Sequence, residues 1–161
     1  MTAATRRLGL CLALGLACVP LVTVRGQPTA QPPAAKNEYY KGKVRPLAEV
    51  LDKQGAKLDA DAAATWFALV TDDGKIYPLV KDDGSRMFFT DKRLLNRPMR
   101  LTARQVPGTQ MLQVVHVHSY LKGELHEVYY WCDVCAIRAY EDGKCACCGD
   151  PMVLKEVPVR D

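Results

Sequence analysis

Between residues 65 and 131 the hydrophobic positions follow the two-residue period of β-strands. Near the start of this region, three short apolar runs are separated by two Asp-Gly pairs. An Asp-Gly pair between apolar runs is a strong signal for a tight hairpin turn. The pattern therefore predicts a meander of two consecutive hairpins. Its strands and turns are residues 66–70, Asp73-Gly74, residues 75–80, Asp83-Gly84 and residues 86–89.

Further strands are expected on both sides of this meander, with two short helical segments between them. Proline near its start and glycine at its end favour a brief helix over residues 46–55. A capped helical turn is expected over residues 90–95, before Pro98. The remaining strands are expected at residues 40–45, 99–104, 111–120 and 125–131, and Lys122-Gly123 turns the chain between the last two.

Short, closely spaced strands with one or two short helices predict a mainly β fold, either a small β-barrel or a curled meander. The stretch from Ala64 to Ser119 resembles an oligonucleotide/oligosaccharide-binding (OB) type barrel of small exported bacterial proteins. This resemblance implies a barrel and carries no implication of nucleic-acid binding. The aromatic side chains are expected to pack in the core and at the barrel ends. They are Trp66, Tyr77, Phe88, Phe89, Tyr129, Tyr130 and Trp131.

The first residues have the pattern of an export signal. Arg6-Arg7 precedes an apolar run over residues 8–22, and small or apolar residues precede a cleavage site at Gln27. Pro20 interrupts the run, which is too short for a membrane span. Two variants stay open: export through the twin-arginine route, and a lipoprotein cut before Cys18 that would leave a membrane anchor. We expect an exported protein, periplasmic or secreted, with a membrane tether only in the lipidated case.

The charge of the chain changes once this signal is removed. Residues 1–26 hold three of the 22 Lys and Arg residues and none of the 18 Asp and Glu residues. The remaining chain is therefore almost neutral, and the sequence pI of about 8.7 derives largely from the signal. A nearly neutral protein lacks the electrostatic footprint of a nucleic-acid-binding domain. The expected organisation is a signal at 1–26, a disordered Pro/Ala-rich linker at 27–38, a β-barrel domain at 39–128 and a metal module at 129–157.

Outside the signal, all five cysteines lie between positions 132 and 148. Four of them form two C-x2-C turns, Cys132/Cys135 and Cys145/Cys148, with nine residues between the turns. Thiolates at both ends of such a turn suit one tetrahedral ion, and Gly149 can supply the positive φ that a chain reversal needs. These four cysteines are the predicted metal ligands. Two disulfides are the alternative, because exported proteins commonly form them.

The segment from Tyr130 to Leu154 resembles two families of small metal modules, zinc ribbons and the short heavy-metal-binding domains of copper and zinc efflux proteins. In the second family an aromatic residue precedes the first cysteine, as Tyr130 does, but Cys135 stands where that family has histidine. Four sulfurs favour Zn²⁺, with Cu⁺ and iron as alternatives. The fifth cysteine, Cys147, is expected to be a small buried side chain beside the cluster. Its alternative roles are a competing ligand or a thiol that reacts with oxidant.

The three histidines lie in the two strands before the cysteines. His116 and His118 share a strand face because side chains alternate with period two. A turn at Lys122-Gly123 would place Glu127 opposite His118, and such a trio could bind a transition-metal ion. A solvated strand face without metal is the simpler interpretation of this pattern.

The sequence contains none of the common catalytic motifs, and we expect a protein that is not an enzyme. The favoured function is an exported, monomeric β-module with a structural four-cysteine zinc site that binds an unknown protein or small molecule. The first alternative is handling or transfer of copper or zinc at the cell envelope. The second is thiol or iron redox chemistry.

Overall fold

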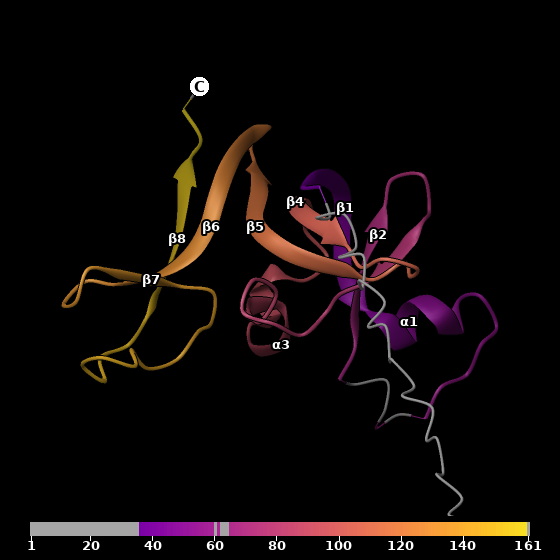
Figure 1. Cartoon of the computed structure of the whole chain (residues 1–161), viewed down its shortest axis with the longest axis horizontal. Helices are drawn as coiled ribbons and strands as arrows, with labels where there is room; N and C mark the ends of the chain where they lie inside the picture. The colour runs from indigo at the N-terminus through magenta and orange to yellow at the C-terminus, as the bar shows by residue number, and fades with distance from the viewer. Residues whose placement is uncertain (1–35, 60, 62–64, 161) are drawn as a thin grey trace, which may run out of the picture. The chain divides into compact units, whose positions relative to one another are not determined.

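A computed structural model describes residues 36–59, 61 and 65–160, so the export signal and most of the predicted linker lie outside the described residues. The described chain is mainly β (Figure 1). None of its helices is both long and apolar enough to cross a membrane. The elements are β1 (Glu38–Pro46), α1 (Leu47–Asp52), β2 (Phe67–Thr71), β3 (Ile76–Pro78), α3 (Met87–Thr90), the 3-10 helix η1 (Lys92–Leu94), β4 (Pro98–Gln105), β5 (Leu112–Leu121), β6 (Glu124–Cys132), β7 (Ile137–Ala139) and β8 (Val153–Pro158).

The eight strands form one open antiparallel sheet in the order β3-β2-β1-β4-β5-β6-β7, with β8 paired to β6. The predicted closed barrel is therefore wrong. The strand that would close it, β3, is three residues long and ends at Pro78, which has no N–H to donate to a ladder. In place of a ladder, an isolated parallel bridge between Leu79 and Leu112 links this end of the sheet to β5. It includes a 2.9 Å hydrogen bond from Val80 N–H to the Leu112 carbonyl.

Of the two predicted hairpins, the first is confirmed and the second is wrong. Gly74 has a φ of 82° in the turn that joins β2 to β3. Gly84 instead lies so close to β5 that a Cβ atom there would come within 2.0 Å of the Val114 carbonyl oxygen. The chain then turns into α3, whose Met87 and Phe88 are buried. Glycine at position 84 permits close packing of two backbone segments. The Asp-Gly pair looks the same in the sequence whether it serves this packing or a hairpin turn.

The hydrophobic core lies between the inner face of the sheet and the α3–η1 segment. Phe88 and Leu94 from this segment are buried against inward side chains such as Leu101 of β4. Trp66 is an exception to the expected aromatic core, since 45% of its surface is exposed. Tyr130, by contrast, is fully buried.

A β-bulge between β4 and β5 resets which residues of β5 face the core. Thr102 pairs with His116, but the next residue of β4, Ala103, pairs with Val114, which leaves Val115 as the extra residue. Val114 and Val117 are therefore both buried although they are three positions apart. The bulge leaves the His116 and His118 side chains together on the outer face of the sheet.

Strand β6 is attached to η1 through a buried polar contact. The Tyr130 hydroxyl donates a 2.6 Å hydrogen bond to Asp91 Oδ2, and Asp91 is itself almost fully buried. The Arg93 backbone N–H donates to Asp91 Oδ1 at 2.9 Å, and the Arg93 guanidinium binds the same carboxylate. The hydrogen bonds from Arg93 lower the pKa of Asp91 to about 2, and burial and the contact with Asp91 raise the pKa of Tyr130. This contact satisfies two buried polar groups at once.

We expect Tyr130→Phe to lower the free energy of unfolding by about 2 kcal/mol, because a hydrogen bond to a buried charged group is lost without loss of ring volume. Urea denaturation measures the change. Tyr40→Phe is the matched control, because the Tyr40 hydroxyl also bonds a carboxylate, Glu38, but in an exposed position. Equal effects of the two substitutions would contradict the structural role given to Tyr130.

The Asp91 carboxylate should make stability depend on acid pH. Its pKa in the folded protein is about 2 against an ordinary value of 3.8, so its contribution is complete above about pH 4 and is lost as the pH falls toward 2. The shift corresponds to about 2 kcal/mol. The difference in unfolding free energy between the wild type and Asp91→Asn should shrink over this range, which urea titrations at each pH would measure. A difference that stays constant with pH would refute the effect.

Candidate metal centre

The two C-x2-C turns lie at the end of the sheet where β6, β7 and β8 meet. The first turn connects β6 to β7, and the second lies between β7 and β8. The sulfur atoms of the four predicted ligands, Cys132, Cys135, Cys145 and Cys148, all lie within 4.8 Å of one another. Cys132 and Cys145 are buried, Cys135 is half-buried and Cys148 is exposed. The structure thus brings together the four sulfurs that the sequence singles out.

The first turn is shaped by hydrogen bonds around Cys132, the last residue of β6. The Cys135 backbone N–H points at the Cys132 sulfur at 3.4 Å, and the Ala136 N–H donates to the Cys132 carbonyl at 2.9 Å. Ala136 has a φ of 52°, a left-handed conformation that is unfavourable for a residue with a side chain. N–H groups that point at a sulfur favour its thiolate form, which is the form that binds metals.

The second turn repeats this arrangement. The Gly149 N–H donates to the Cys145 carbonyl at 2.9 Å, and Gly149 has the expected positive φ, 81°. Backbone N–H groups of Cys148 and Cys147 lower the pKa of the Cys145 thiol to about 7. Hydrogen bonds from Cys145 N–H to the Asp150 carbonyl (2.7 Å) and from Met152 N–H to the Gly143 carbonyl (2.8 Å) close the loop. Both turns therefore present sulfur and N–H groups in the same way.

The fifth cysteine does not have the predicted environment. Cys147 is exposed, so the expectation of a buried packing residue is wrong. Its neighbours Ala146 and Cys148 are exposed as well, because the second turn projects from the sheet and little chain covers it. Cys147 is not among the four cysteines whose sulfurs converge.

The cysteine turns are held to the rest of the sheet by the strands on both edges of β6. The Tyr130-Trp131 segment of β6 pairs with β7 and also with β8, so these two strands occupy opposite edges. Glu156 of β8 accepts hydrogen bonds from Arg97 at 2.5 Å and from Ser119 of β5 at 2.8 Å. The C-terminal strand therefore fixes the metal turns to the larger part of the sheet.

The geometry of the sulfurs suits a metal ion. Four thiolates around Zn²⁺ at about 2.3 Å would have sulfur–sulfur separations of about 3.8 Å. The Cys132 and Cys148 sulfurs are 3.5 Å apart, whereas a disulfide requires about 2.0 Å. All five cysteines are free thiols in the structure. The donor set and its spacing therefore fit a tetrahedral thiolate site.

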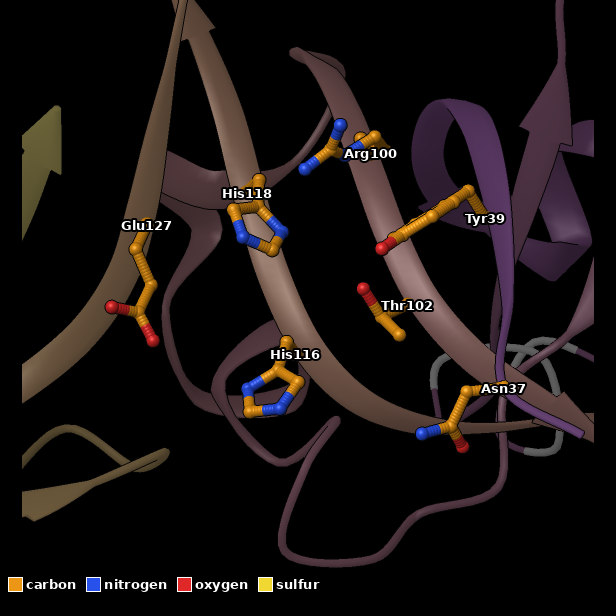
Figure 2. Close-up of a pocket in the computed structure, with 7 residues that line it drawn as sticks. All are labelled: Asn37, Tyr39, Arg100, Thr102, His116, His118 and Glu127. Carbon is orange, nitrogen blue, oxygen red and sulfur yellow. The ribbon is translucent and has the colours of Figure 1, made fainter. Parts of the chain in front are cut away.

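The three histidines lie in β5 and β6, and Figure 2 shows His116 and His118. His118 pairs with Glu127 across β5 and β6, as the Lys122-Gly123 turn predicts, and His116 lies on the same face. His126 is buried, and its Nδ1 lies 3.1 Å from the Glu124 carbonyl oxygen. Within the described ranges, the cysteines are the one group of ligand atoms close enough to hold an ion. The structure therefore gives no support to a metal site at His116, His118 and Glu127.

No protein-family model matches the chain, and no curated protein or solved structure is significantly similar to it.

We expect Gly149→Ala to weaken metal retention by the cysteine turns. Gly149 has a positive φ and open space around its Cα, so alanine there introduces backbone strain of about 1 kcal/mol without a clash. Gly108→Ala is the matched control, because Gly108 has a φ of 74° and open space in the loop between β4 and β5. Both variants should lose similar stability, but competition with a chelator should show weaker metal retention only in the first. Equal retention in the two would contradict a role for this turn in the site.

Proposed function

We propose that the protein is an exported, non-enzymatic binding module whose C-terminal cysteine turns hold one structural Zn²⁺. The convergence of four sulfurs from two similar turns is the observation that carries this proposal. On this proposal, residues 1–26 direct export and are removed. N-terminal sequencing of the exported protein would test this, because the mature chain should begin at Gln27.

Zinc is the preferred ion because of the donor set. Four thiolates in a tetrahedral arrangement are typical of structural zinc sites, and zinc carries no redox chemistry. The N–H groups directed at the sulfurs reduce the excess negative charge of such a site. Iron could occupy the same four sulfurs, and its thiolate absorption bands would distinguish it from zinc.

A structural role follows from how little of the cysteine segment is buried. From Asp133 to Met152, only Cys145 is buried. β7 contributes three residues to the sheet in this stretch. Tyr140 and Met152 pack partly buried against the core, but this apolar burial is too small to offset the conformational entropy of the segment. Zinc binding supplies on the order of 10 kcal/mol to comparable peptides. The ion therefore takes the place of a hydrophobic core in this segment.

A binding role is supported by the arrangement of the first five strands. They follow the order β3-β2-β1-β4-β5, with α3 between β3 and β4, an arrangement similar to that of an OB-type fold. OB-type folds are often only partly closed and bind ligands on the sheet face. This supports the OB-type resemblance of the sequence and a role in which the sheet presents a ligand-binding surface.

Handling of copper or zinc is the second candidate, and the exposure of Cys148 favours it. A ligand sulfur at the surface is open to attack by an acceptor thiol or a chelator, whereas a structural ion is usually enclosed. Rapid exchange of the ion with a competing chelator and tight binding of Cu⁺ would favour this second role. Exchange over hours, together with loss of structure, would favour the structural role.

Elemental analysis of the purified mature protein should show about one equivalent of zinc per chain. Each of the substitutions Cys132→Ser, Cys135→Ser, Cys145→Ser and Cys148→Ser should strongly reduce that content and the protease resistance of the C-terminal segment. Cys147→Ser is the matched control and should retain the metal, because this exposed thiol is not one of the four. A metal-free native protein with the four cysteines joined as two disulfides would overturn the proposal.

A further inference from the structure

A polar cavity of about 390 Å³ lies on the outer face of the sheet (Figure 2), and no cysteine lines it. Side chains from four adjacent strands line it, together with Asn37, which directly precedes β1. The strand register explains why these residues meet. Tyr39, Thr102 and His116 form one row across β1, β4 and β5, and Arg100, His118 and Glu127 form the next row across β4, β5 and β6.

The cavity contains one positive charge that is not neutralised. The carboxylate of Glu127 forms an ion pair with Arg138 of β7 at 2.5 Å. Arg100 has no carboxylate partner among the described residues, and its guanidinium lies 4.8 Å from the centre of the Tyr39 ring. The acidic group of the cavity is therefore already paired, whereas its arginine is available to a ligand.

Several polar atoms of the cavity also lack partners. Arg100 Nε, a donor, and His118 Nδ1 are buried atoms without a hydrogen-bond partner in the described part of the chain. The Asn37 side-chain oxygen accepts a 2.8 Å hydrogen bond from Arg104 Nε, which leaves the Asn37 amide N–H₂ group free to donate. Thr102 is buried, and its hydroxyl points into the cavity. Buried polar groups without partners are costly, so a ligand with acceptor atoms would be favoured here.

These features favour an anion over a cation. The fixed charge of Arg100 repels a metal ion and attracts an anion. Guanidinium, hydroxyl and amide donors together are the groups that proteins use to bind carboxylates and phosphates. Tyr39 adds an exposed aromatic ring at the rim, and the volume lies within the range of small-molecule sites.

We propose that this cavity binds a small organic anion whose carboxylate or phosphate group is held by Arg100 and Thr102, with the body of the ligand against Tyr39 and His116. This inference rests on the binding role proposed above and specifies the class of ligand. The site itself does not include the cysteines, so it can be tested separately from the zinc.

The experiment titrates the zinc-containing mature protein with glucuronate, glucose 6-phosphate and inorganic phosphate, with glucose as the uncharged probe. Binding is followed by calorimetry and by the NMR signals of the His116 and His118 rings. At least one anion should bind and shift both histidine signals, whereas glucose should not. The carboxylate and phosphate arms identify which oxyanion is preferred. Binding should weaken as salt is raised, because the Arg100 side chain is partly exposed.

Arg100→Gln should weaken anion binding by roughly tenfold or more, as expected for loss of a charge-assisted hydrogen bond. Lys53→Gln is the matched control: it removes the same charge at the exposed end of α1, outside the cavity, and should leave binding unchanged. Failure of all three anions to bind at millimolar concentration would overturn the proposal, as would equal weakening by the two substitutions. Metal content measured on the same samples separates a failure of this proposal from a failure of the zinc proposal.

Discussion

The structure depends on β6, a single strand that belongs to two parts of the sheet. Its first half pairs with β5 and its second half with β7, while β8 covers the opposite edge of both halves. The ladders of β7 and β8 on the two edges of β6 therefore join the cysteine turns to the sheet through the backbone. The buried Tyr130–Asp91 contact fixes the inner face of the same strand. The position of the candidate metal centre is therefore set by β6, whose side chains also reach the core and the outer cavity.

The two candidate sites use opposite physical means to order their surroundings. In the cysteine segment, apolar burial is small and comes from side chains such as Tyr140 and Met152, and the proposed ion would supply the remaining order. The outer cavity is built on paired strands of the sheet, beside the bulge at Val115. On this backbone, Arg100 can remain without a carboxylate partner among the described residues and stay available to a ligand. Rigid strands beneath such a surface limit the entropy lost on binding.

Local patterns were predictable from the sequence, and packing between distant segments was not. The cysteine turns and the pairing of His118 with Glu127 follow from short-range spacing, which a single sequence records. The hairpin turn predicted at Gly84 is wrong because glycine is required there by the close approach of the Val114 backbone, and Val114 lies far along the chain. The bulge at Val115 has no residue signal of its own, and neither closure of the barrel nor exposure of Cys147 can be read from periodicity. The role proposed for Arg100 depends on the strand register, which places it in one row with His118 and Glu127.

The pairing of β8 has a consequence for the order in which the protein acquires its structure. Residues 153–158 follow both cysteine turns in the chain, yet they cover the edge of β6 and supply Glu156 to Arg97 and Ser119. Until this segment emerges during synthesis, β6 presents an unpaired edge of the kind that invites association with other chains. The capture of an ion by the two turns would draw that final strand into place. The native topology would then be completed by a late event that depends on metal supply.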